Sequence, residues 1–464
     1  MPIYDHPKML SAQDLVIFHA ALSDLQGNLL KSHGRHHAAH LFLTFQPGQQ
    51  KNARQFLAAM SLHVTSAEAQ TEQTKDFKAG GTEVVFEQCM LSSDGYRYLE
   101  IAVDDFDSSF QKGMKDSAIN RNLSDPSVAD WQLEYQRQLH AMIIIAHSDP
   151  RALMQRVEQI EGALAGIALV YNEMGDAVFR VNDPNNEPIE HFGYLDGRSQ
   201  PIFFQDDWIK NERSTANWNP QAKPGLILTQ DLRAASPESA GSYFVFRKLE
   251  QNVQGFKKRE QALADALGLV GKDARELAGA MVVGRFENGT PVMLHSLADP
   301  EVAPPENDFN ASMNPDGNKC PFAAHIRKVN PRGVNAKAED LAGEKSHRIA
   351  RRGITFGDTT PPGDDLDLLP TDGVGLLFQC CNGVLGTQFE LMQQCWANDP
   401  NFPKSDIGID PVIGQHQGET TVQKWPNPYD SPNWLTFSFQ DFVTMKGGEY
   451  FFVPSISFLK NLVD

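Results

Sequence analysis

The sequence predicts an α+β fold in which the two halves of the chain repeat one alternation of strands and helices. Short segments rich in strand-forming residues recur along the chain, and helices with a single apolar face separate them. The length of 464 residues is too great for one ordinary hydrophobic core. With 41% hydrophobic and 22% charged residues, the composition is that of a globular protein with enough apolar material to enclose a large ligand.

The first half carries the strand and helix order of one compact α+β unit. Strand-forming residues predict four strands, at residues 40–45, 82–89, 140–146 and 167–171. Apolar residues at helical spacing predict two helices, at residues 53–62 and 149–165. Asp149 and Pro150 are a typical cap and first-turn residue for the second of these helices. This order is typical of a ferredoxin-like domain.

The second half repeats the alternation with longer insertions. Predicted strands lie at residues 242–247, 375–380 and 448–454, and predicted helices at residues 253–269 and 384–396. Two insertions, at about residues 287–319 and 357–374, are rich in Pro, Gly, Asn and Asp. The polar segment 205–225 is a reasonable linker. We therefore expect an N-terminal domain over residues 1–215 and a C-terminal domain over residues 216–464.

Charge and cysteine content exclude several classes of partner. The net charge of −18 argues against nucleic acid or an anionic membrane as the main partner, because both need a positive face. No apolar run approaches the roughly 20 residues that span a bilayer, and residues 1–10 lack the pattern of a secretory signal. The five cysteines, an odd number, favour reduced thiols in a cytoplasmic protein, although a mature secreted chain would have a similar start.

The segment 320–332 holds the most informative histidine. His325 follows an apolar approach, and Arg327, Lys328 and Arg332 come directly after it. An imidazole beside clustered cations suits a flat, anionic, iron-bearing cofactor, because the ring nitrogen can ligate iron while guanidinium groups bind propionates. On general grounds such a histidine is more often a hydrogen-bonded filler or a surface residue.

A zinc site is a weaker alternative for the same histidine. Paired C-x-x-C spacing is missing among the available ligands, which are His325, Cys320, Cys380, Cys381 and Cys395. A ligating histidine normally donates its second N–H to a carboxylate or carbonyl group. Glu390, on the helix predicted after the strand 375–380, is a candidate for that partner.

Two further segments carry candidate catalytic residues. Asp196 lies in the segment 191–201 between aromatic residues and Gly197, where it either stabilises a tight turn or acts as a general base. Arg351 lies in a basic segment that either stabilises developing negative charge or is a solvated or phosphate-binding loop. Leu376 and Phe378 are two apart on a predicted strand and so share one face, as core residues or as the wall of a cofactor pocket.

Together these segments resemble the dye-decolorizing peroxidase family. The G-x-x-D-G motif of the family matches residues 193–197, its histidine stretch matches residues 321–332, and its arginine segment matches residues 351–357 with Leu376 and Phe378 following. Further similar segments lie at residues 24–28, 283–291 and 447–452. The resemblance covers most of the chain, and the order and joint presence of the motifs make it specific.

The resemblance implies two ferredoxin-like domains with antiparallel sheets, as in dimeric α+β barrels, with one heme b per chain mainly in the C-terminal domain. By the same resemblance His325 is the iron ligand, Asp196 the distal acid and base, and Arg351 the distal cation, with Leu376 and Phe378 lining the distal side. It also implies oxidation of dyes, phenols and other small aromatic reductants by hydrogen peroxide, through an oxyferryl and porphyrin-radical intermediate. Candidate propionate contacts are His191, Arg327, Arg332 and Arg352.

Two departures limit what the resemblance implies. Phe356 stands where many relatives have tyrosine, so no tyrosyl radical can form at that position. Trp396 resembles the position of an electron-relaying tryptophan in some relatives, but core packing is the more common role of such a residue. A heme-binding or heme-handling protein with incidental turnover, and a zinc or purely structural protein, are the competing hypotheses. The sequence leaves the oligomeric state open, a homo-oligomer included.

Overall fold

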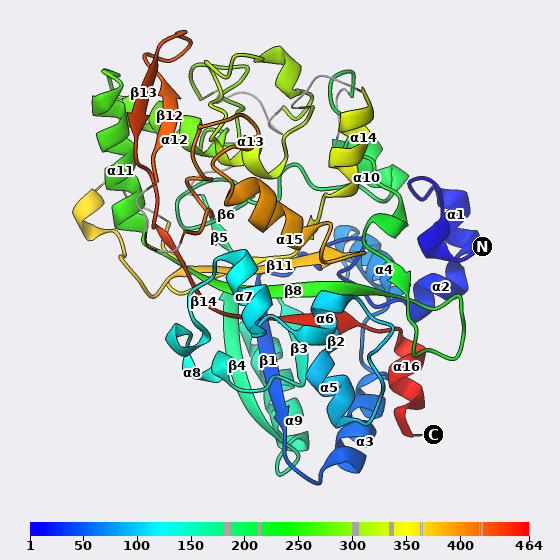
Figure 1. Cartoon of the computed structure of the whole chain (residues 1–464). Coiled ribbons are helices and arrows are strands. Elements are labelled where there is room, and N and C mark those ends of the chain that lie inside the picture. Colours follow the sequence, from blue (N-terminus) through cyan, green and yellow to red (C-terminus); the bar gives the residue numbers. More distant parts are fainter. Residues whose placement is uncertain are drawn as a thin grey trace.

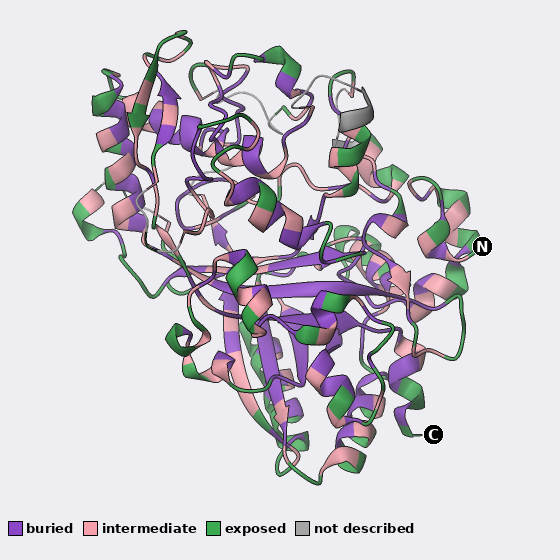
Figure 2. Cartoon of the chain, in the orientation of Figure 1, coloured by how far each residue is buried: buried purple, intermediate pink, exposed green. Residues whose placement is uncertain are grey.

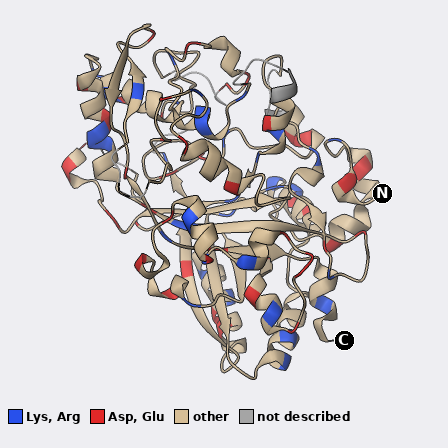
Figure 3. Cartoon of the chain, viewed as in Figure 1, with Lys and Arg blue, Asp and Glu red and all other residues tan. Residues whose placement is uncertain are grey.

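One curved antiparallel sheet runs through the whole molecule (Figure 1). The computed structural model describes residues 1–180, 187–211, 215–298, 306–333, 338–361, 363, 365–416, 418 and 421–463. The main path of the sheet has the strand order β10-β11-β8-β14-β2-β3-β1-β4. Its central strands are largely buried, whereas acidic and basic residues lie mostly on the surrounding helices and loops (Figures 2 and 3).

The N-terminal half contributes one end of this sheet. Its strands are β1 (His37–Phe45), β2 (Phe86–Ser92), β3 (Ala141–His147) and β4 (Ala168–Asp176), in the spatial order β2-β3-β1-β4. All three pairings are antiparallel. The helices α3 (Gln50–Met60) and α9 (Pro150–Ala163) follow β1 and β3, and Asp149 caps α9 through the amide of Arg151, as the sequence predicted.

The C-terminal half repeats that arrangement. Its strands on the main path of the sheet are β8 (Ala240–Gln251), β10 (Ile354–Phe356), β11 (Gly375–Asn382) and β14 (Val443–Val453), and all pair antiparallel. The helices α11 (Val253–Ala266) and α12 (Ala274–Val283) follow β8. The two halves join where β14 pairs with β2 through Phe451 opposite Ser92 and Phe452 opposite Leu91. The predicted α+β fold with antiparallel sheets is therefore confirmed.

The two ends of the strand order approach each other, so that the sheet curls toward a barrel. The hydroxyl of Thr355, on β10, donates a hydrogen bond to the carbonyl oxygen of Asp176, on β4. Gly175 allows this approach, because a Cβ atom there would overlap the side chain of Ile354. Glycine is needed here for close contact between two strands.

The helix predicted at residues 384–396 is shorter in the structure. It begins at Phe389, and α15 (Phe389–Leu391) continues directly into the π-helical turn η6 (Met392–Ala397). The side chain of Gln388 accepts hydrogen bonds from the amides of Gly383 and Val384 and so holds the preceding residues in a turn. No helix among the described residues is long and apolar enough to cross a membrane.

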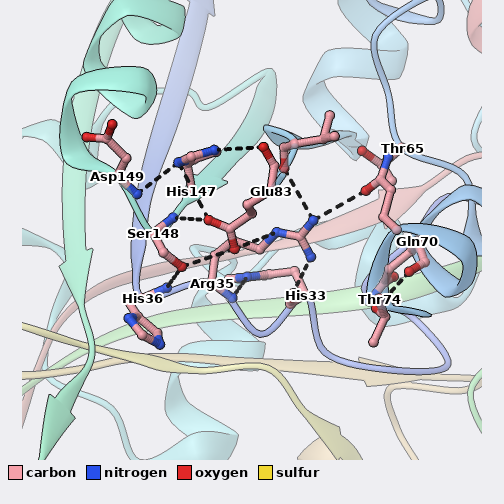
Figure 4. Close-up of polar contacts among 12 residues, drawn as sticks. His33, Arg35, His36, Thr65, Gln70, Thr74, Glu83, His147, Ser148 and Asp149 are labelled. Carbon is pink, nitrogen blue, oxygen red and sulfur yellow. Dashed lines mark hydrogen bonds and ion pairs between the residues drawn. The ribbon is translucent and has the colours of Figure 1, made fainter. Parts of the chain in front are cut away.

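A polar network closes one end of the N-terminal half (Figure 4). The carboxylate of Glu83 accepts hydrogen bonds from the amide of Ser148, at 2.7 Å, and from its hydroxyl, at 3.0 Å. Arg35 and His147 lie 3.7 Å and 3.6 Å from the same carboxylate. The network thus joins the segments before β1 and β2 to the end of β3.

Candidate active site

A cavity of about 270 Å³ lies where the C-terminal half meets the loop after β6 (Pro188–Ile189). Arginine, acidic and apolar side chains share its wall, so the cavity can take a ligand that is both hydrophobic and charged. The wall comes from separate stretches of the chain, within residues 190–199, 247–251, 283–285, 325–330, 348–351, 376–378, 389–393 and 412–415, together with Val443.

His325 faces this cavity from the first position of the short helix α13 (His325–Val329). Its Nδ1 atom lies 2.8 Å from Oδ2 of Asp410, whose side chain is fully buried. The other carboxylate oxygen of Asp410 accepts the amides of Val412 and Ile413, at 2.7 and 3.0 Å. Such a carboxylate fixes the imidazole tautomer, with the proton on Nδ1 and the lone pair of Nε2 free for a metal.

Asp410 is held in its ionised form. Burial alone would raise the pKa of this carboxyl group, but the His325 imidazole and the two backbone amides outweigh burial and lower the pKa below its usual range. Glu390, the partner expected from the sequence, instead accepts hydrogen bonds from Ser109, at 2.9 Å, and Tyr450, at 2.8 Å. That expectation was wrong because the late start of α15 turns Glu390 toward α6 (Ser108–Lys112) and β14.

Asp196 and Arg351 line the same cavity and contact each other. Nη1 of Arg351 lies 3.4 Å from Oδ1 of Asp196, and their side chains are 35% and 26% exposed. The same Asp196 oxygen accepts the amide of Gly197, at 2.6 Å, so Asp196 also stabilises the turn. Gln200 fixes the arginine by accepting its backbone amide, at 3.0 Å. The structure thus brings a carboxylate and a guanidinium together at a partly open part of the wall.

Leu376 and Phe378 both line the cavity from β11. They share a face of the strand, as their spacing predicted, and Phe378 lies 6.3 Å from the ring of Phe389. Phe389 and Met392 extend the same apolar surface from α15 and η6. Large apolar side chains therefore form one part of the cavity wall.

Three arginines expected at propionates have backbone partners elsewhere and are not among the lining residues. Arg327 donates to the carbonyl of Asn314, at 3.3 Å, because successive residues of a helix are about 100° apart and Arg327 points roughly opposite His325. Arg332 donates to the carbonyls of Asn307 and Phe309, at 2.9 and 3.0 Å, and Arg352 donates to those of Asn28, at 2.6 Å, and Leu29.

His191 also lies outside the cavity wall. It is 2% exposed, and its Nε2 atom is 2.8 Å from the carbonyl oxygen of Phe356. Burial lowers the pKa of this imidazole. His191 thus joins the loop after β6 to β10, and its expected propionate contact stays a prediction.

Other arginines, which the sequence did not single out, reach the wall. Arg348 is 8% exposed and donates to the carbonyls of Pro220 and Gln221, both at 3.1 Å, and no carboxylate among the described residues pairs with it. Burial lowers its pKa to about 10. Arg247 pairs with buried Asp125, whose Oδ2 lies 2.9 Å from Nη1. Arg348 belongs to the basic segment around Arg351, but the sequence assigned no role to Arg348 or Arg247, because only the fold shows that they lie beside a cavity.

Glu190 is a second carboxyl group in the wall. Its oxygens accept the side-chain amide of Gln251, at 2.5 Å, and the backbone amides of Phe192 and Tyr194, at 2.9 and 3.0 Å. Burial outweighs these hydrogen bonds and raises the pKa of Glu190 to about 7. Its contacts shape the turn that leads to Asp196.

The described residues offer no cluster of three or more His, Cys, Asp or Glu side chains suited to a metal ion. All five cysteines are free thiols. The site therefore provides one imidazole ligand, an apolar wall and several guanidinium groups. A porphyrin matches this set, because its iron needs an axial nitrogen, its ring needs apolar contact, and its propionates need cations.

Comparisons with known proteins agree with this chemistry. Residues 24–177 match the model of the DyP dimeric alpha+beta barrel domain. The chain is 43% identical to the multifunctional dye peroxidase DyP2 of Amycolatopsis sp., over 95% of this chain and 96% of that protein. The chain belongs to the dye-decolorizing peroxidase family. This membership confirms the resemblance seen in the sequence.

More distant relatives and solved structures give the same result. Dye-decolorizing peroxidase AauDyP1 of Auricularia auricula-judae is 29% identical to this peroxidase, over 97% of this chain and 88% of the relative. The crystal structure of an Anabaena sp. DyP-type peroxidase superposes with a TM-score of 0.92 at 39% identity, covering 99% of each chain. The protein is therefore a heme peroxidase, and the family does not favour a heme-handling protein with incidental turnover.

Proposed function

We propose that this peroxidase binds one heme b per chain with His325 as the axial ligand. The supporting observation is the 2.8 Å contact between Nδ1 of His325 and buried Asp410, which leaves Nε2 for the iron. Arg348 is our candidate for a propionate contact, because it is a buried guanidinium in the cavity wall whose hydrogen bonds go to backbone carbonyls.

Hydrogen peroxide is the proposed oxidant, and dyes, phenols and other small aromatic molecules are the proposed reductants. The bound heme supplies the two-electron reduction of peroxide and the one-electron oxidation of the reductants. Asp196 takes a proton from the near oxygen of hydrogen peroxide and returns it to the leaving oxygen. Arg351, at 3.4 Å from Asp196, stabilises the negative charge that develops between these steps.

The remaining wall selects the size of the oxidant. Leu376 and Phe378 fill the space beside Arg351 and admit only small molecules. We propose the domain boundary between residues 215 and 216, so that residues 1–215 supply the loop with Asp196 and residues 216–464 supply His325. The five free thiols favour a reducing compartment such as the cytoplasm.

The test is the absorption spectrum and the peroxide-dependent turnover of purified variants. We expect His325→Ala to lose the Soret band of bound heme or change it grossly, and Asp196→Asn to retain that band with turnover lowered by about 100-fold or more. The matched control is His63→Ala, because His63 is an exposed histidine away from the cavity. An unchanged Soret band and unchanged turnover in His325→Ala would remove this histidine from the axial role.

A further inference from the structure

Lys328 is a buried cation that none of the steps above uses. It follows His325 by three residues on α13, and it is 0% exposed. Its Nζ atom donates to the carbonyl oxygen of Asp399, at 2.7 Å. No carboxylate of the described residues forms an ion pair with it. Burial of an ammonium group without a directly bound anion costs free energy. We therefore expect a negative charge close to Lys328 with which it interacts.

The nearby charge is the carboxylate of Asp410. The amide of Asp410 donates to the carbonyl of Ala397, the last residue of η6, at 2.8 Å, and Lys328 donates to Asp399, two residues further along, so both are anchored to the same short stretch of chain. Asp410 and Asp399 raise the pKa of Lys328, while burial, the larger effect, lowers it to about 8. Residues three apart on a helix are neighbours, so Lys328 lies on the side of α13 from which His325 reaches Asp410, and the two opposite charges share this part of the interior.

Such an interaction is effective although the two groups do not touch. The Asp410 side chain is 0% exposed, so little water screens its charge. The same carboxylate accepts the Nδ1 proton of His325. A cation that attracts the carboxylate charge weakens the pull of that carboxylate on the imidazole proton.

We propose that Lys328 tunes the axial imidazole by partly neutralising Asp410, an inference that rests on the proposed role of His325 as the iron ligand. Lys328 is then a positioning residue that acts through Asp410. An imidazole whose proton is drawn more strongly to its partner is a stronger donor to iron and stabilises the ferric state. Lys328 limits this effect and holds the reduction potential of the bound heme higher than Asp410 alone would.

The experiment replaces Lys328 in the heme-loaded protein and measures two properties of the iron. One is the ferric/ferrous potential from a spectroelectrochemical titration, and the other is the iron–histidine stretching frequency from resonance Raman spectra of the ferrous protein. We expect Lys328→Met to shift the potential to a more negative value and to raise the stretching frequency. Lys328→Gln keeps a donor for the Asp399 carbonyl while removing the charge, and we expect the same shifts.

Arg327→Met is the matched control, because Arg327 is the neighbouring buried cation of α13 and also donates to a carbonyl group. It removes one positive charge at a similar position in sequence without acting through Asp410. We expect the stretching frequency of this variant to stay at the wild-type value. Equal shifts in both variants would show a general charge effect and overturn the proposed role of Asp410 as the mediator.

An unchanged potential and frequency in Lys328→Gln would overturn the inference even if Lys328→Met failed to fold, because the glutamine variant keeps a hydrogen-bond donor at this position. Lys328→Arg restores the charge, and we expect it to return the frequency toward the wild-type value. Loss of the inference is distinguishable from loss of the proposed function. If His325→Ala keeps its Soret band and its turnover, the axial role itself fails, whatever the Lys328 variants show.

Discussion

The two polar pairs at the cavity, His325 with Asp410 and Asp196 with Arg351, differ in the distance between their partners and in their exposure to solvent. His325 and Asp410 are 2.8 Å apart, and the carboxylate is fully buried with two further amide donors. Asp196 and Arg351 are 3.4 Å apart and about a quarter to a third exposed. A ligand to iron needs one fixed orientation, whereas groups that exchange protons with peroxide need access to it. The difference in burial thus follows the difference in task.

A substitution in the buried pair, His325 with Asp410, gives the largest expected effect on stability. Asp410→Ala removes the carboxylate and leaves the Val412 and Ile413 amides without their acceptor. We expect the free energy of unfolding to fall by about 3–5 kcal/mol, together with weakened heme retention. Urea unfolding measures the first and the Soret band the second. Asp406→Ala is the control, because the Asp406 side chain is 85% exposed; an equal loss in that variant would contradict the contrast.

A substitution in the exposed pair, Asp196 with Arg351, should affect the rate of reaction with peroxide far more than stability. Arg351→Leu removes a guanidinium that is 35% exposed, so we expect stability to change by less than about 1 kcal/mol. The rate of the absorbance change on mixing with peroxide should fall about 100- to 1000-fold, because charge stabilisation is lost. Stopped-flow spectroscopy measures this rate, with Arg121→Leu as an exposed-arginine control. A large stability loss with normal kinetics would assign Arg351 a structural role.

Glu190, a third acidic group at the cavity, should make the stability of the protein depend on pH. Its folded pKa of about 7 lies above the ordinary value of 4.5, so the folded state favours the protonated form. The contribution to stability is complete below pH 4.5 and is lost as the pH rises through 7. Glu190→Gln should therefore gain up to about 3 kcal/mol over the wild type as the pH rises through this range.

Urea unfolding at the two ends of this pH range measures the difference between Glu190→Gln and the wild type. Glu158→Gln, at an exposed position, is the matched control and should follow the wild type at every pH. A constant difference between Glu190→Gln and the wild type across the range would contradict the assigned titration.

Trp396 should give the smallest effect on activity. It is 8% exposed and stacks on Phe402 with a ring separation of 5.3 Å, which favours the core role over electron relay. We expect Trp396→Phe to lower the free energy of unfolding by about 1–2 kcal/mol and to leave oxidation of a bulky dye unchanged. Steady-state dye oxidation checks this. A selective loss of bulky-dye oxidation, with the oxidation of small phenols unaffected, would instead support an electron-relay role for Trp396.

Local patterns predicted the fold and the residues whose position depends on short stretches of chain. Alternation of strands and helices gave both halves, and the two-residue spacing of Leu376 and Phe378 gave their shared face. The segments with His325, Asp196 and Arg351 were also predicted, and the structure brings all three to one cavity.

The partner of His325 could not be predicted in this way. Asp410 lies 85 residues further along the chain and follows η6 in an irregular loop, so no periodicity marks it. The burial of Arg348 in the wall was equally unpredicted, because its hydrogen bonds go to backbone carbonyls that any sequence provides. Long-range contacts of irregular segments are fixed by tertiary packing and leave no local trace.

The approach of β4 to β10 has a consequence for association between molecules. These two strands end the order of the main sheet, and an exposed terminal strand is a ready template for pairing with a neighbouring chain. Here each terminal strand shields the other, through Thr355 and the bare backbone at Gly175. A side chain placed at Gly175 would separate β4 from β10. The edges of both strands would then be exposed and would act as sites for aggregation.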